Sequence, residues 1–242
     1  MVANRKVGKA GYVHSIYTSG MVDGPGIRYL VFFSGCALRC KYCHNPDTWN
    51  MKSGKLMTVD EIIDDIRGYK SYLEFSNGGV TITGGDPLVQ GRFLMSLLER
   101  CKAEGLHTAI DTSGYGNRHL VERVLQYTDL MLLDIKSINP TIYENITGVP
   151  LDRTLETLRI SKEIGVKVWI RYVLVPGLTD KLEDMQKLAD YLKPYDNIEK
   201  VEVMPFHKAG EFKWRDLMHK YELWDTEPPT QESIDIARRI LE

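Results

Sequence analysis

Three cysteines stand close together in the first quarter of this 242-residue chain. Cys36, Cys40 and Cys43 have the spacing C-x3-C-x2-C, so one short loop can turn three sulfurs toward one centre. Thiolate ligands select iron–sulfur clusters or zinc. Structural zinc normally takes four protein ligands, and the fourth would have to be His44 or the distant Cys101. We therefore expect a cluster, in which three cysteines leave one of four irons open for chemistry.

Glycines and an acid follow two further apolar runs. Gly84 and Gly85 come directly after the run 79–83, and glycine lets a backbone approach a ligand closely. Asp111 ends the next apolar run, 107–111. These residues are candidates to meet the cysteine loop, with a plain turn or a helix N-cap as the alternative.

Charged side chains also lie within apolar runs. Period-two alternation places Asp134 and Lys136 on one face of the run 130–136. An acid and a base there indicate a binding site, with a local ion pair as the alternative. Arg171 lies in the middle of another apolar run, so it needs a partner or a water-filled cavity. A carboxylate suits it.

The elements that must position these residues alternate along the chain. Alternating strands and helices indicate a parallel sheet with helices outside. A closed barrel has eight such units, whereas this chain has about six. We predict a partial (β/α)6 TIM-type barrel, open on one side, with a doubly wound sheet as the alternative. Both place the site at the C-terminal ends of the strands, which are predicted at 29–33, 79–83, 107–111, 130–136, 167–175 and 198–204.

Composition limits the remaining classes. The formal net charge of −2 gives no reason to propose nucleic-acid binding, which normally requires an excess of basic residues. No apolar run approaches the length of a membrane helix. The polar start 1–9 has no signal-peptide core, so we expect a cytoplasmic protein. We expect a single domain over 1–242, with an N-terminal extension and turn at 1–27, a barrel core at 28–207 and a C-terminal extension and helix at 208–242.

The cysteine loop resembles that of the radical S-adenosylmethionine enzymes. Tyr42 and the continuation Cys43-His44-Asn45 resemble, more narrowly, the pyruvate formate-lyase activating enzymes. The turn Asp23-Gly24-Pro25-Gly26 before Arg28 matches their D-G-P-G-x-R motif. Several activases of other glycyl radical enzymes carry an inserted cysteine cluster, and the interval between Cys43 and Cys101 contains none. This favours the pyruvate formate-lyase type.

The resemblance implies the cofactors and their residues. It implies one 4Fe–4S cluster with three cysteine ligands and an open iron that holds S-adenosylmethionine. A monovalent cation is implied at Asp111 and Thr112. The family has Gly-Gly-Glu where this chain has Gly-Gly-Asp, one methylene shorter. The residues that the resemblance places at the cofactor are Tyr42, Cys43, His44, Gly84, Gly85, Asp86, Asp111, Asp134, Ile135, Lys136 and His207.

The resemblance also implies the reaction and the partners. Reductive cleavage of S-adenosylmethionine yields a 5′-deoxyadenosyl radical, which takes hydrogen from a glycine Cα of pyruvate formate-lyase. Asp23 and Arg171 would hold the glycine loop, and flavodoxin or ferredoxin would supply the electron. The alternatives are an activase of another glycyl radical enzyme, a radical enzyme with a small-molecule substrate, and an iron–sulfur electron carrier.

Overall fold

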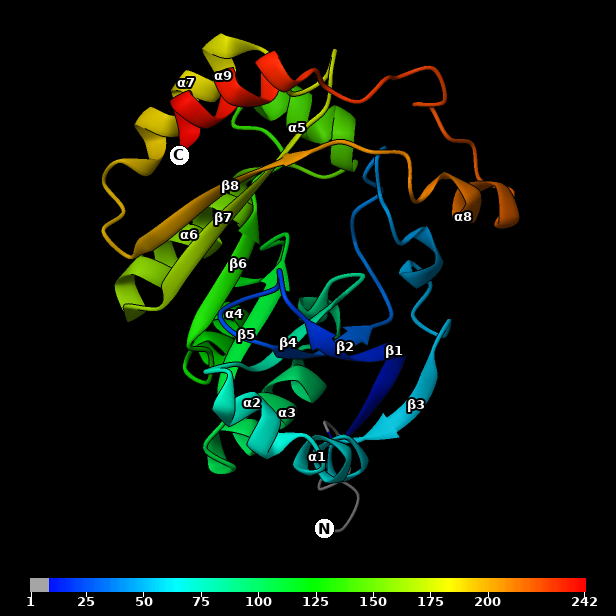
Figure 1. Ribbon diagram of the computed structural model, residues 1–242, viewed down its shortest axis with the longest axis vertical. Coiled ribbons are helices and arrows are strands. Elements are labelled where there is room, and N and C mark those ends of the chain that lie inside the picture. The colour runs from blue at the N-terminus through cyan, green and yellow to red at the C-terminus, as the bar shows by residue number, and fades with distance from the viewer. Residues whose placement is uncertain (1–8) are drawn as a thin grey trace.

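A computed structural model describes residues 9–242, which form one mixed sheet with helices packed around it (Figure 1). Six neighbouring strands of this sheet run parallel, in the order β2-β4-β5-β6-β7-β8. The predicted partial barrel is therefore confirmed. The parallel strands are β2 (Arg28–Phe33), β4 (Gly79–Gly84), β5 (His107–Thr112), β6 (Leu130–Asp134), β7 (Lys167–Leu174) and β8 (Ile198–Pro205).

Two antiparallel strands extend the sheet beyond β2. β1 (Ala10–Gly20) pairs with β2, and its first residues, Ala10 to Val13, pair with β3 (Lys55–Thr58). The pattern of the sequence did not predict β3. In residues 9–242, the sheet begins at β3 and ends at β8, and these two strands do not pair with each other. The barrel is consequently open between its first and last strands.

Helices cover the outer face of the curved sheet, and local signals explain several of their ends. α1 begins after Thr58, whose side chain accepts from Glu61 N while Glu61 accepts from Thr58 N, the predicted capping box. Gly165 ends α6 in the left-handed conformation, at φ 83°. The helices are α1 (Val59–Arg67), α2 (Lys70–Phe75), α3 (Gly91–Ala103), α4 (Arg118–Leu125), α5 (Pro140–Thr147), α6 (Asp152–Ile164), α7 (Leu182–Leu192), α8 (Glu211–Asp216) and α9 (Gln231–Leu241).

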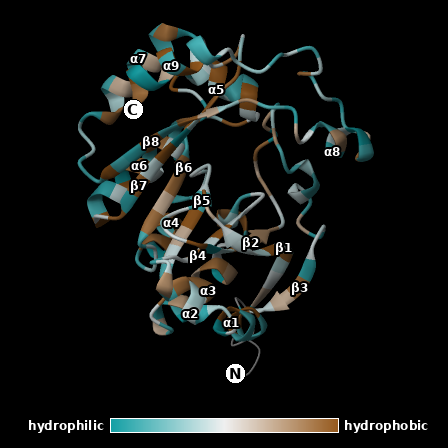
Figure 2. Ribbon diagram, in the orientation of Figure 1, coloured by the Kyte–Doolittle hydropathy of each residue, from teal (hydrophilic) through white to brown (hydrophobic). Residues whose placement is uncertain are grey.

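The main core lies between the parallel strands and the helices. Figure 2 shows hydrophobic segments along the strands and on helix faces. Ile62, Ile63 and Ile66 of α1 are buried there, and so is Cys101 of α3. Cys101 therefore packs as a small core side chain. None of the helices within residues 9–242 has the length and apolar character needed to span a membrane.

Candidate active site

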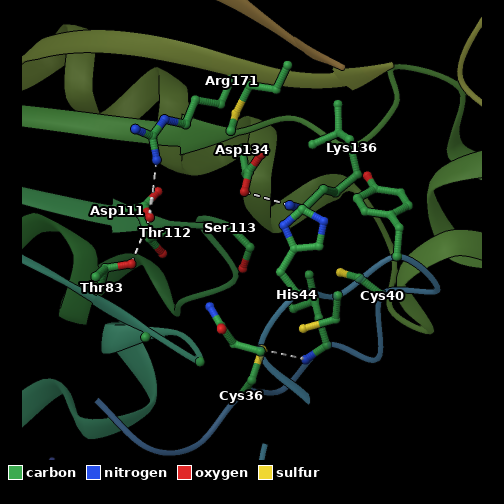
Figure 3. A pocket seen from close by; sticks show the side chains of 18 of the residues that line it. Cys36, Cys40, His44, Thr83, Asp111, Thr112, Ser113, Asp134, Lys136 and Arg171 are labelled. Atoms are coloured by element: carbon green, nitrogen blue, oxygen red, sulfur yellow. Dashed lines mark hydrogen bonds and ion pairs between the residues drawn. The ribbon is translucent and has the colours of Figure 1, made fainter. Parts of the chain in front are cut away.

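A cavity of about 350 Å³ lies at the C-terminal ends of the parallel strands. The cysteine loop forms one wall, and residues that follow β4, β5 and β6 form another (Figure 3). The structure thus brings most of the predicted residues together. Those that line the cavity are Asp23, Cys36, Cys40, Tyr42, Cys43, His44, Gly84, Gly85, Asp111, Thr112, Asp134, Lys136, Arg171 and His207.

The cysteine loop is fixed by backbone hydrogen bonds to distant segments. Gly35 N donates to Thr48 O at 2.7 Å, and Arg39 N donates to Thr147 O of α5 at 2.8 Å. Lys41 N donates to Ile146 O at 3.1 Å. These bonds hold the three thiols at one wall of the cavity before any ligand arrives.

The three thiols fit a multi-iron cluster. Within residues 9–242, no three His, Cys, Asp or Glu side chains are grouped so that they could hold a single metal ion. Cys36, Cys40 and Cys43 instead surround a larger space. Burial raises the pKa of the Cys40 thiol to about 12 and raises the pKa of the other two thiols as well. Positively charged iron would offset this cost of forming buried thiolates.

Gly84 and Gly85 allow the turn after β4 to pass close to the cysteine loop. Gly84 has a φ of 121°, and a Cβ there would lie 2.2 Å from Phe33 O. A Cβ on Gly85 would lie 2.3 Å from Gly35 O and 3.2 Å from the Cβ of Cys36. Both positions therefore require glycine.

Asp86 and Ile135 do not line the cavity, in contrast to the other residues predicted at the cofactor. Ile135 is fully buried in the main core. Asp86 is 2% exposed and accepts hydrogen bonds from Leu88 N at 3.0 Å, Thr112 Oγ1 at 2.8 Å and Ser113 N at 3.0 Å. Its carboxylate thus connects the turn after β4 to the loop after β5.

Asp134 and Lys136 form an ion pair at the cavity wall, with Lys136 Nζ 2.5 Å from Asp134 Oδ2. Lys136 Nζ also lies 5.6 Å from the ring centroid of Tyr42. Burial disfavours the charge of Lys136, but Asp134, Tyr42 and Cys40 together outweigh it and keep the pKa of this ammonium well above its usual range. Asp134 Oδ1 and Tyr42 Oη are buried and have no hydrogen-bond partner among residues 9–242. Unpaired polar atoms at a cavity indicate a place for a polar ligand.

Arg171 lies among three carboxylates. Its guanidinium is 3.3 Å from Asp23 Oδ1, 3.3 Å from Asp111 Oδ2 and 3.5 Å from Glu202 Oε2. Asp111 also accepts from Thr83 Oγ1 at 2.7 Å (Figure 3). Burial raises the pKa of Asp111, and Arg171 opposes that rise. The sequence predicts that Arg171 needs a partner or a water-filled cavity, and these three carboxylates are partners that the sequence alone does not identify.

Glu202 is not among the site residues predicted from the sequence, although a charged residue within a predicted strand is a recognisable signal. It lies within the strand predicted at 198–204, and β8 pairs it directly with Arg171 of β7. A charged residue in a strand next to a buried arginine is a candidate partner. The sequence could not reveal the register that brings these two residues opposite each other.

Two histidines meet at the rim. The rings of His44 and His207 have centroids 4.1 Å apart, and His44 Nε2 lies 3.2 Å from His207 O. Burial, followed by the nearby His207, lowers the pKa of His44. The contact joins the cysteine loop to the residues that follow β8.

The C-terminal extension packs on the cysteine loop, which the sequence did not predict. Trp214 of α8 donates from Nε1 to Cys43 O at 2.8 Å and lies edge-on to Trp49. Lys213 Nζ lies 2.9 Å from Asn45 Oδ1. Tryptophan enrichment in an irregular segment was the only signal for this cover.

Known proteins share this sequence and fold. Residues 30–192 match the model of the radical SAM superfamily. The chain is 49% identical to a pyruvate formate-lyase-activating enzyme of Clostridium pasteurianum, over 92% of this chain and 93% of that protein. It is 40% identical to the pyruvate formate-lyase 1-activating enzyme of Escherichia coli K12, over 96% and 95% of the two chains.

A solved structure agrees. A crystallised domain of a pyruvate-formate lyase-activating enzyme from Bacteroides vulgatus has a TM-score of 0.57 and 27% identity to this chain. The match covers 68% of this chain and 92% of that one. With its three thiols in one cavity of a partial barrel, this chain belongs to the radical SAM superfamily and, within it, to the pyruvate formate-lyase-activating enzymes.

Proposed function

We propose that this chain activates pyruvate formate-lyase by forming a radical on one of its glycine residues. Identity of 49% to a named activating enzyme, over nearly the whole of both chains, carries this proposal. The family uses a 4Fe–4S cluster and S-adenosylmethionine, which together supply one-electron cleavage of a carbon–sulfur bond and a radical that removes hydrogen from the glycine Cα. The protein's own part is to bind, orient and exclude water.

Cys36, Cys40 and Cys43 are the proposed ligands of the cluster, and one iron is left without a protein ligand. Their support is the shared cavity and the lack of a fourth thiol in it. Lys136 is proposed to meet the carboxylate of S-adenosylmethionine, because a charged ammonium at a cavity suits an anion. His44 and His207 would contact the same ligand at the rim.

The backbone of Gly84 and Gly85 would bind the polar end of S-adenosylmethionine, and Tyr42 would pack beside it. Asp111 and Thr112 are proposed to bind a monovalent cation, with Asp134 close by. Asp86 acts indirectly in this proposal, because its oxygens are already occupied by the loop after β5.

Asp23 and Arg171 are proposed to hold the glycine loop of the partner. They are joined at 3.3 Å and both line the cavity. The opening between the first and last strands of the sheet, β3 and β8, would admit the loop. Flavodoxin or ferredoxin is the proposed reductant. The proposed compartment is the cytoplasm, because it keeps thiols reduced. Residues 1–242 are proposed to form a single domain.

The test uses cluster-loaded protein under anaerobic conditions. With S-adenosylmethionine and dithionite, we expect 5′-deoxyadenosine, and pyruvate formate-lyase should then show the electron paramagnetic resonance signal of a glycyl radical. An electron carrier would form no 5′-deoxyadenosine. An enzyme for a small molecule, or for a different glycyl radical enzyme, would form it without producing that radical on pyruvate formate-lyase.

A further inference from the structure

Trp49 reaches from the cavity to the outer side of the cysteine loop. Trp49 lines the cavity together with the three cysteines. On the other side, the guanidinium of Arg39 lies 4.9 Å from the centroid of the Trp49 ring, and the His219 ring stacks on it at 5.4 Å with an interplanar angle of 29°. Arg39 and His219 are both exposed. One aromatic side chain therefore separates the thiols from groups at the protein surface.

Trp49 also contacts the cysteine loop directly. Cys36 N donates to Trp49 O at 3.4 Å. Trp49 and Cys43 pack against the same small hydrophobic cluster, and both line the cavity. Trp214 packs edge-on against Trp49 at 5.1 Å and donates to Cys43 O. The indole of Trp49 is thus in contact with surface side chains and lies at the same cavity as the three thiols.

The surface around Trp49 is basic although the whole chain has a net charge of −2. Arg39, Lys52, Arg215 and Lys220 are exposed, and within residues 9–242 none of them has an ion-pair partner. Other acids nearby are already paired: Asp47 with Lys213 and His14, and Glu222 with Lys41. Glu211 and Asp216 of α8 carry two opposing charges against these four basic groups, so a positive excess remains.

Apolar side chains are exposed beside these basic groups. Met218 is 92% exposed, Phe212 is 51% exposed and Leu217 is 38% exposed. Exposed apolar groups with a charged rim are typical of a protein interaction site. An electron donor that complements this surface would carry acidic side chains around an apolar cofactor edge, and flavodoxin, one of the two reductants proposed above, is assigned that role here.

We propose that this surface is the docking site of flavodoxin and that Trp49 lies on the electron path from its flavin to Cys43. The surface, here called the entry face, consists of Arg39, Trp49, Lys52, Phe212, Arg215, Leu217, Met218, His219 and Lys220. One electron leaves the reduced flavin and one electron enters the cluster held by the three thiolates, and no atom or proton is transferred. The inference rests on the proposed function, which makes this cluster the acceptor.

The experiment follows the absorbance of the bound cluster in a stopped-flow instrument, with reduced flavodoxin or dithionite as the donor. The variant Arg215→Glu/Lys220→Glu reverses two charges of the entry face. Its matched control, Arg92→Glu/Arg239→Glu, reverses two exposed charges on α3 and α9 that also lack ion-pair partners within the described part of the chain. Attraction of opposite charges accelerates association by about 10-fold or more, and salt screens it.

We expect the entry-face variant to slow reduction by flavodoxin about 10-fold at low salt, with a smaller difference at high salt. The control should match the unmodified protein, and dithionite should reduce all three at the same rate. Equal flavodoxin rates in the two double variants would overturn the docking site. A loss that is equally large with dithionite would overturn it too, because the defect would then lie at the cluster.

A second variant tests the path. Trp49→Leu should lower the flavodoxin rate at saturating flavodoxin several-fold relative to its dithionite rate. Trp169→Leu, at an indole outside the cavity, should leave this ratio unchanged. An unchanged ratio in Trp49→Leu at equal iron content would remove Trp49 from the path. If the unmodified protein formed no 5′-deoxyadenosine with dithionite, the proposed function would fail while these reduction rates could still be read.

Discussion

Arg171 of β7 lies 3.3 Å from Asp23, which is 148 positions earlier in the chain and follows β1. The same guanidinium donates to Val22 O at 2.6 Å. These contacts join the turn at one edge of the open barrel to a strand near its other edge. A partner loop that enters between these edges would meet both residues.

The first prediction concerns this turn. Asp23→Ala should lower the initial rate of glycyl radical formation on subsaturating pyruvate formate-lyase, because displacement of a substrate by about 1 Å can cost on the order of 100-fold. Electron paramagnetic resonance measures the rate. Cluster content and S-adenosylmethionine affinity should stay normal, and the exposed Asp216→Ala serves as the control. An undiminished rate in Asp23→Ala would mean that the turn has no part in holding the loop.

Lys136→Ala should weaken S-adenosylmethionine binding without loss of the cluster signal. A charge-assisted contact contributes about 1.5–3 kcal/mol, which corresponds to a Kd about 10- to 150-fold higher. Isothermal titration of the cluster-loaded protein measures this. Lys102→Ala removes an exposed ion pair with Asp129 outside the cavity and should leave the Kd unchanged. Equal affinity in the two variants would reject the role of Lys136.

Cys101→Ala should retain full iron content and the visible absorbance of the cluster. Cys101 is fully buried in the helix core and does not line the cavity, so it cannot reach the cluster. Alanine in place of Cys36, Cys40 or Cys43 should each cause loss of iron. Iron analysis after anaerobic reconstitution is the measurement, and loss of about a quarter or more of the iron in Cys101→Ala would contradict the assignment.

Asp86→Ala should destabilise the fold more than it affects ligand binding. The substitution leaves Leu88 N and Ser113 N buried without their acceptor, at a cost of about 1–3 kcal/mol for each donor. Urea unfolding measures the loss. Asp86→Asn, which keeps one oxygen, should lose less. Full stability in Asp86→Ala would show that the carboxylate does not fix the loop after β5.

His107 gives a prediction for pH. Burial, followed by the positive charge of Arg28, lowers the pKa of His107 below its usual 6.5. The unfolded chain therefore binds a proton at a higher pH than the folded protein does, so stability decreases as the pH falls below about 6.5. His107→Gln should make the free energy of unfolding depend less steeply on pH. The change in slope should correspond to less than one bound proton, because only one group is removed. Urea unfolding midpoints between pH 5.5 and 7.5 measure it, and an unchanged slope would contradict the assignment.

Local patterns were sufficient for much of the fold. Continuous apolar runs separated by helical segments predicted the parallel strands. A strand that is buried on both faces requires such a continuous apolar sequence. The capping box of Thr58 and Glu61 predicted the start of α1, since all of its hydrogen bonds lie within four residues. β3 was missed because Lys55–Thr58 is short and half-polar, and only its pairing with β1 makes it a strand.

The sequence by itself determined which chemistry the site can hold, because the spacing of Cys36, Cys40 and Cys43 within one loop is a local property. It also predicted that Arg171 needs a partner. Tertiary structure alone decided which carboxylates meet that arginine, that Asp86 binds the loop after β5, and that Trp214 covers a loop 171 positions earlier. Strand register and chain closure set these contacts, and both depend on packing between elements that lie far apart in the sequence.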